Sequence, residues 1–228
     1  MTYLVSILIS LLLAVFACVF YYFYNEKIKL GNMLKRAAII RIFKPSRVTV
    51  SLIVVCLIIG VIFGWAYDNS DENIMILAVK QITLCTLFLI SIIDYQKKMI
   101  LNQLVLFIFV VGLLSLLKRF MDNPSSVESI FYPALLGMVV GGGILLVANV
   151  ITRKGSIGAG DVKLFAAIGF VLGFSDLIGA MFYCFLFSAI IGLILLVFKK
   201  AKMHDSIAMA PFAFLGVFVA VLFAMRGI

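Results

Sequence analysis

Apolar runs close to membrane-spanning length recur along the whole chain, and they restrict its fold more than any other feature. A helix that crosses a bilayer needs about 20 consecutive, mostly apolar residues. Of the 228 residues, 65% are hydrophobic and 13% are charged, whereas soluble domains have about 45–50% apolar and about 25% charged residues. The predicted segments are residues 3–24, 49–67, 74–94, 100–117, 131–151, 158–173, 176–198 and 207–225.

Only helices and closed barrels satisfy their backbone hydrogen bonds inside lipid, and runs of this length and composition are helical. We therefore expect an all-α, polytopic membrane protein with about eight transmembrane segments in one membrane-embedded domain over residues 1–228. The segment 158–173 is short and rich in glycine. It could be tilted, buried among the other helices, or only partly spanning.

The positive charges predict the orientation. Most of the 19 lysines and arginines fall in residues 25–48, 95–99, 152–157 and 199–206, which alternate to one side of the membrane. The positive-inside rule makes that side cytoplasmic and places the N-terminus outside, in the cell inner membrane. The first run lacks the preceding basic residues of a cleaved signal peptide, so it is predicted to remain as a helix.

The basic loop at residues 25–48 leaves two interpretations open. Its stretch Met33–Phe43 has apolar residues near one helical face with cations beside them, which suits a helix lying on an anionic leaflet. A plain cytoplasmic loop explains the same charges. In either case the net charge of +9 is concentrated in loops between apolar runs, so the expected partner is the lipid bilayer and not nucleic acid.

Two aspartates at the ends of apolar segments are the candidate catalytic residues. Asp94 ends the segment 74–94, and Asp161 opens the segment 158–173 directly after Gly158-Ala159-Gly160. An ionisable group in or near lipid is costly, which makes it a candidate for function. The predicted topology puts both at the cytoplasmic level, so they are able to meet.

Two neighbouring carboxyls share one proton and titrate as a pair. The ionised member draws a proton from a water that attacks a peptide carbonyl, while the protonated member donates to the carbonyl oxygen. No metal or cofactor is required. Either aspartate fits either role. Each also has a plainer explanation, because Asp161 could be a helix N-terminal residue favoured by the dipole and Asp94 could be an interfacial loop residue.

The sequence lacks the residue patterns that other protease mechanisms, metal sites and phosphate-binding loops require. The single histidine, His204, lies in a basic loop beside Asp205, so HExxH zinc-protease and rhomboid-type serine–histidine arrangements lack their parts. The four cysteines lie within apolar runs without CxxC spacing, so we interpret them as buried apolar residues, with neither a disulfide nor a metal site. The triplet Gly141-Gly142-Gly143 lies inside an apolar segment, where it predicts close helix packing and not phosphate binding.

Glycines and one proline are the candidate substrate-binding residues. Gly158 and Gly160 lack side chains, which permits unusual backbone angles and lets a strand-like substrate approach the main chain. Pro211, near the start of the last segment, is expected to line the substrate groove. Lys163 is expected to extend to the interface and not to pair with Asp161.

The stretch Gly158-Ala159-Gly160-Asp161-Val162-Lys163 resembles the GxGDxK signature of the type IV prepilin peptidases, which are intramembrane aspartyl proteases. Further likenesses follow in the family's order over residues 85–225. They are Asp94 with Ile100-Leu101-Asn102, the glycine-spaced helix through Gly169 and Gly173, and residues 208–216 around Pro211. The resemblance implies catalytic roles for Asp94 and Asp161, and cleavage of the basic leader of prepilins or pseudopilins.

The chain departs from this family at three points. Leu101 stands where the family usually has proline, and Pro211 alone remains of its C-terminal prolines. Larger members carry paired CxxC motifs in a cytoplasmic domain, whereas residues 25–48 contain no cysteine. Zinc and N-methyltransferase activity are therefore not expected. The presenilin-like branch shares GxGD but has tyrosine before its first aspartate, where this chain has the order Asp94-Tyr95.

Two other functions remain as alternatives. A proton- or cation-coupled transporter could use the two aspartates as carriers. An inactive homologue could act as an assembly partner of a secretion machine. The oligomeric state is left open.

Overall fold

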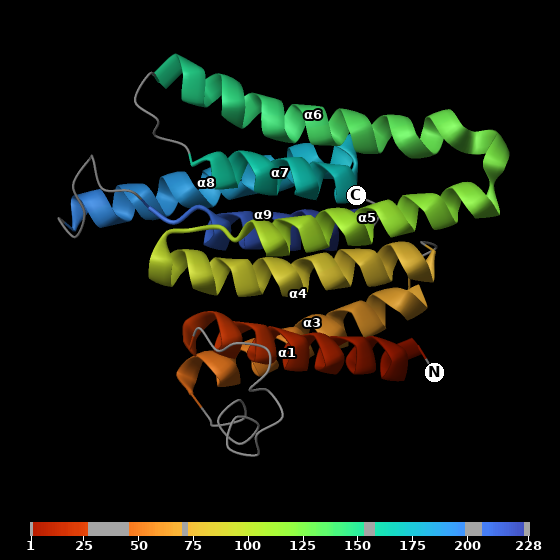
Figure 1. Ribbon diagram of the computed structural model, residues 1–228, viewed down its shortest axis with the longest axis horizontal. Coiled ribbons are helices and arrows are strands. Elements are labelled where there is room, and N and C mark those ends of the chain that lie inside the picture. The colour runs from red at the N-terminus through yellow and green to blue at the C-terminus, as the bar shows by residue number, and fades with distance from the viewer. Residues whose placement is uncertain (1, 27–45, 70–72, 153–157, 199–206, 226–228) are drawn as a thin grey trace. The chain divides into compact units, whose positions relative to one another are not determined.

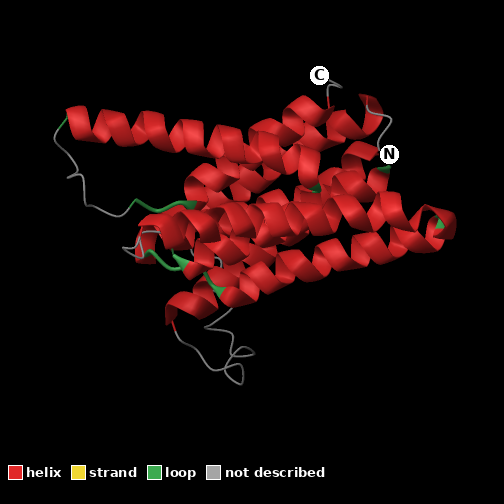
Figure 2. Ribbon diagram, turned by 90° about the horizontal axis from the view of Figure 1, so that it is seen from above, coloured by secondary structure: helices red, strands yellow, loops and turns green. Residues whose placement is uncertain are grey.

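The computed structural model describes residues 2–26, 46–69, 73–152, 158–198 and 207–225 (Figure 1). The basic loop lies mostly outside these residues, so both interpretations of Met33–Phe43 stay predictions. The described residues contain helices and connecting turns but no strand (Figure 2). The α-helices are α1 (Thr2–Glu26), α3 (Arg47–Asn69), α4 (Ile74–Lys97), α5 (Asn102–Asp122), α6 (Val127–Thr152), α7 (Ala159–Leu172), α8 (Phe174–Val197) and α9 (Ala210–Met225).

These helices confirm the all-α class and the number of apolar segments. Six of the described helices, α1, α3, α4, α5, α6 and α8, are long and apolar enough to cross a membrane. Helix α9 is apolar but has 16 residues. Helix α7 has 14 residues, which gives a length of about 21 Å, shorter than the hydrocarbon core of about 30 Å. Half of its residues are buried, so α7 is a short helix enclosed by its neighbours.

The chain forms two compact units, Met1–Leu89 and Ile90–Ile228, whose boundary lies inside α4. The expected single domain over residues 1–228 stays a prediction. In the first unit α1 packs against α3. Ser6 Oγ of α1 donates to the Gly60 carbonyl of α3 at 2.8 Å. The Gln81 amide links α4 to α1, because its Nε2 atom donates to the Ser6 carbonyl at 2.8 Å and to Ser10 Oγ at 2.7 Å. Each polar group of this buried cluster therefore has a partner, as burial requires.

All four cysteines are buried free thiols, which confirms their interpretation as buried apolar residues. Cys18, Cys56 and Cys85 belong to the first unit, and Cys184 belongs to the second.

In the second unit α6, α5 and α8 all contact α7, and α8 packs against α9. Glycines allow the closest approaches. A Cβ atom on Gly137 of α6 would lie 2.3 Å from the carbonyl oxygen of Gly169 in α7, and one on Gly141 would lie 2.5 Å from that of Phe165. The predicted packing role of the glycine triplet is thus confirmed for Gly141 and extends to Gly142. Gly143, by contrast, has nothing within 4 Å.

The chain reverses direction at Gly173, between α7 and α8. Gly173 has φ +80° and ψ 175°, a conformation that is open essentially to glycine alone. This turn brings α8 back beside α7, and α6 contacts both of these helices.

Candidate active site

Asp94 lies in the last turn of α4, with 5% of its side chain exposed. The helix continues three residues beyond the predicted end and stops at Lys97. Lys98 then takes the left-handed conformation, with φ 50°, and its amide donates to the Asp94 carbonyl at 2.7 Å. The chain therefore turns away directly behind Asp94, and the carboxyl group stays inside the second unit.

The first residue of α9 contacts this carboxyl group. The Ala210 amide donates a hydrogen bond to Asp94 Oδ2 at 3.0 Å. The first amides of a helix lack intrahelical acceptors, and they carry the positive end of the helix dipole. The Asp94 carboxyl group thus accepts a hydrogen bond from the N-terminus of α9.

Sequence reasoning selected Pro211 and missed Ala210. Pro211 is the second residue of α9 and is half-buried. The signal was available, since proline is favoured in the first turn of a helix. A proline there indicates that the amide just before it lies at the helix N-terminus and is free for another acceptor.

Asp161 is the third residue of α7 and is half-buried. Its Oδ2 atom accepts a hydrogen bond from the Gly158 amide at 3.2 Å. The plainer sequence interpretation, an aspartate at the start of a helix, therefore describes its local contact correctly. That contact does not describe the whole environment of the carboxyl group.

The structure brings the two aspartates within electrostatic range of one another. Burial raises the pKa of the Asp161 carboxyl to about 6, and the nearby Asp94 carboxylate contributes to the same shift, while the Gly158 amide opposes it. Asp161 lies near the start of α7, which is not one of the membrane-spanning helices. The end of α4 and the starts of α7 and α9 all lie at one end of the second unit (Figure 1).

Neither signature glycine has an unusual backbone conformation, and Gly160 matters because its missing side chain leaves room for a neighbour. Gly158 has ordinary extended backbone, with φ −66° and ψ 140°, and among the described glycines a positive φ occurs at Gly173. The expectation of unusual angles at Gly158 and Gly160 is therefore wrong. A Cβ atom on Gly160 would lie 3.0 Å from the Ile100 Cβ atom. Gly160 thus lets the start of α7 lie against the turn that follows Asp94, while Gly158 is exposed.

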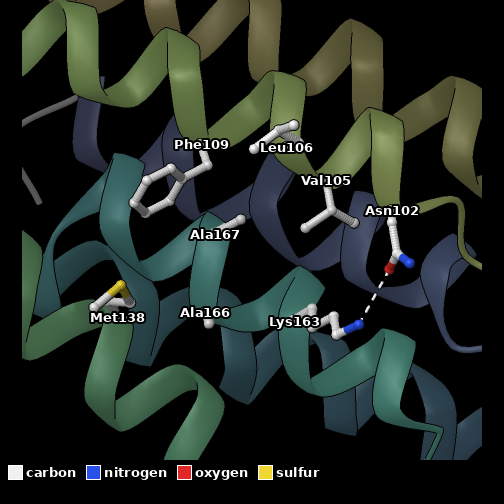
Figure 3. A pocket seen from close by; sticks show the side chains of 8 residues that line it. All are labelled: Asn102, Val105, Leu106, Phe109, Met138, Lys163, Ala166 and Ala167. Atoms are coloured by element: carbon white, nitrogen blue, oxygen red, sulfur yellow. Dashed lines mark hydrogen bonds between the residues drawn. The ribbon is translucent and has the colours of Figure 1, made fainter.

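Lys163 is exposed, and its Nζ atom donates to Asn102 Oδ1 at 3.3 Å (Figure 3). It makes this contact instead of pairing with Asp161, in agreement with the sequence prediction. Successive helical residues are about 100° apart, so Lys163 and Asp161 are about 200° apart around α7. Within the described ranges, no three His, Cys, Asp or Glu side chains are grouped as a metal site would require.

Fold and site together define a polytopic helical membrane protein with a carboxyl pair where three helix ends meet. Residues 81–197 match the type IV leader peptidase family, and the chain belongs to this family. It is similar to the prepilin leader peptidase/N-methyltransferase of Bacillus subtilis (strain 168), with 37% identity over 93 residues. That alignment covers 41% of this chain and 37% of the relative. No solved structure matches the chain significantly.

Proposed function

We propose that the protein is an aspartyl endopeptidase that removes the short basic leader from type IV prepilins or pseudopilins. Family membership supports leader cleavage, and the B. subtilis relative carries the same activity in its name. The observation that carries the aspartyl mechanism is the electrostatic interaction between the two carboxyl groups, because burial and then the Asp94 carboxylate raise the pKa of Asp161 to about 6. Asp94 and Asp161 are the proposed catalytic residues.

The surroundings of the two carboxyls favour a division of roles. Asp94 receives the Ala210 amide at the N-terminus of α9, and this donor orients the carboxyl group as an acceptor. Asp161 has its pKa raised, so it retains a proton more readily. We therefore assign Asp94 as the general base and Asp161 as the general acid of the resting pair, which shares one proton.

The cleavage step then balances without a cofactor. Asp94 accepts a proton from a water molecule as the water oxygen bonds to the scissile carbonyl carbon. Asp161 gives its proton to the carbonyl oxygen, which forms a tetrahedral diol. Collapse of the diol breaks the carbon–nitrogen bond, with Asp94 protonating the leaving amine and Asp161 recovering its proton from the diol hydroxyl.

The charge pattern supports a cytoplasmic site in the inner membrane. The end of α4 adjoins Lys97 and Lys98 in the sequence, and the start of α7 follows the basic residues 153–154. Basic loops stay on the cytoplasmic side. A basic leader stays on that side for the same reason. The exposed Gly158 and the half-buried Pro211 flank the pair, and we propose that they line the path of the substrate backbone.

The test is the mass of a candidate prepilin co-expressed with the full chain. Wild type should remove the leader, and Asp94→Asn and Asp161→Asn should each leave it intact. Asp122→Asn is the matched control, because it makes the same chemical change in an exposed carboxyl that pairs with Lys118 at the far end of α5.

Cleavage by either active-site variant would refute the aspartyl mechanism. The same spectrum reveals whether the new N-terminus gains a methyl group, the second activity in the name of the relative. We propose peptidase activity without it. A wild-type protein that leaves every tested leader intact, while moving protons or cations across a vesicle membrane, would favour transport instead.

A further inference from the structure

A groove of about 440 Å³ opens between α5, α6 and α7 (Figure 3). Its walls are apolar and include Val105 and Phe109 of α5, Met138 of α6 and Ala167 of α7. Phe109 and Met138 lie at one end in the view of Figure 3, and Lys163 and Asn102 lie at the other. The groove is thus apolar along its walls and polar at one end.

The cation at that end is hydrogen-bonded to a neutral partner. Lys163 Nζ donates to the neutral Asn102 amide oxygen at 3.3 Å. No carboxylate in the described part of the chain lies within ion-pair distance of it. An oxyanion would make shorter and stronger hydrogen bonds with the ammonium than this amide does, and the Asn102 NH₂ group supplies two further donors.

The groove is distinct from the proposed catalytic site. Lys163 lies about 200° around α7 from Asp161, so the groove and the carboxyl pair adjoin different sides of this helix. The groove volume of about 440 Å³ suits a small or extended ligand. The fitting ligand is therefore an extended apolar chain with an anionic group at one end.

We propose that the groove binds one acyl chain of an anionic phospholipid, whose phosphate is held by Lys163 and Asn102. Leu106, which lines the groove, is 62% exposed on a membrane-spanning helix, and this opens the groove toward the lipid. The proposal does not depend on peptidase activity. It assigns the lysine of the GAGDVK stretch to lipid binding and not to the reaction.

The second unit contains a groove that serves as a control. It has a similar volume of about 460 Å³ and lies along α6, where its lining includes Val139, Gly143 and Val147. Every residue that lines it is uncharged and apolar or glycine. If apolar volume alone retained lipid, the two grooves would bind all lipids equally. A preference for anionic headgroups is expected only beside Lys163.

The experiment uses the purified full chain in phosphatidylcholine vesicles that contain traces of a photoreactive lipid. The diazirine is placed in the acyl chain, and the headgroup is either phosphatidylglycerol or phosphatidylcholine. After irradiation, labelled peptides are mapped by mass spectrometry. Peptides of α5 and α7 should carry the phosphatidylglycerol probe about fivefold more than the phosphatidylcholine probe, as expected for one lysine beside an anionic headgroup.

Variants distinguish the contribution of the Lys163 charge to lipid labelling from that of the apolar walls. Lys163→Gln should bring the labelling ratio of the two probes close to one, and Lys163→Arg should preserve it, which also controls for folding. Leu106→Trp should narrow the groove and lower labelling by both probes. Gly143→Leu fills the control groove and should leave the ratio at α5 and α7 unchanged.

Equal labelling by both headgroups in wild type, or an unchanged ratio in Lys163→Gln, would overturn the proposal and leave the groove as ordinary lipid-facing surface. A prepilin peptide that displaced the probe from the Asp161→Asn variant would also overturn it, in favour of a substrate subsite. None of these measurements requires cleavage, so failure of the proposed peptidase function would not be mistaken for failure of lipid binding.

Discussion

The Ala210 amide donates a hydrogen bond to Asp94 Oδ2 at 3.0 Å, across 116 positions of sequence. It links the start of the last helix to the end of α4, and it presents a helix N-terminus to one of the two carboxyl groups. Both partners are buried, so the hydrogen bond is shielded from water. A buried donor to a carboxylate both orients the group and favours its charge.

Removal of this amide should slow leader cleavage while leaving the helix intact. Ala210→Pro deletes the N–H group at a position where helices tolerate proline. A hydrogen bond to a charged group is worth about 1.5–3 kcal/mol, so cleavage should fall about 10- to 100-fold. Ala210→Ser keeps the amide and is the control. Equal cleavage rates for both variants, at equal melting temperature, would show that the hydrogen bond has no role in the reaction.

Asp161 should lose its proton as the pH rises through about 6. Its pKa of about 6 exceeds the usual value of 3.8, so the carboxyl is protonated below this pH and ionised above it. Carbodiimides react with protonated carboxyls, and labelling of Asp161 should fall as the pH rises through about 6. The acid role also predicts that kcat/KM falls over the same range, because kcat/KM reports the free enzyme.

The Asp94→Asn variant controls for the cause of this shift. It removes the negative neighbour, so the midpoint of Asp161 labelling should move to lower pH. The shift should be partial, because burial is the larger cause. An unchanged midpoint would mean that the two carboxyls do not interact.

Replacing either of two glycines of α6 by alanine should change the stability of the protein, in opposite directions at the two positions. Gly137→Ala would place a Cβ atom 2.3 Å from the Gly169 carbonyl oxygen, which forces α6 and α7 apart and should destabilise the fold by about 1–3 kcal/mol. Gly143→Ala meets nothing within 4 Å and should stabilise the helix by about 0.5–1 kcal/mol. Thermal unfolding in detergent measures both, and changes of the same sign would contradict the described packing of α6 on α7.

Leu101→Pro should stabilise the protein. Leu101 precedes the first residue of α5 with φ −78° and ψ 120°, and proline fixes φ at about −65 ± 15°. Proline there should add about 0.4–1 kcal/mol by restricting the unfolded chain. Leu106→Pro, at an exposed position inside the same helix, should instead cost about 3 kcal/mol or more. Destabilisation by Leu101→Pro would mean that the turn after Asp94 needs freedom that proline denies.

The elements of this fold could be predicted from sequence because each depends on residues adjacent in the chain. The length of an apolar run determines whether a helix can cross a membrane, so the helices were predictable to within a few residues at their ends. The ends themselves depended on other signals. Helix α4 runs past Asp94 to Lys97 because the left-handed Lys98, and not the first charge, ends it. Likewise the aspartates stood out because a carboxyl beside an apolar run is costly.

The sequence by itself therefore determined a helical membrane protein, its two candidate carboxyls and the glycines that permit close packing. Only the tertiary structure decided how these carboxyls differ, because their difference comes from contacts between distant helices. The amide on Asp94 belongs to α9, the space beside Gly160 is filled by Ile100, and Lys163 meets Asn102 of α5. No local pattern contains these contacts, since they depend on how the helices pack, and packing is a property of the whole chain.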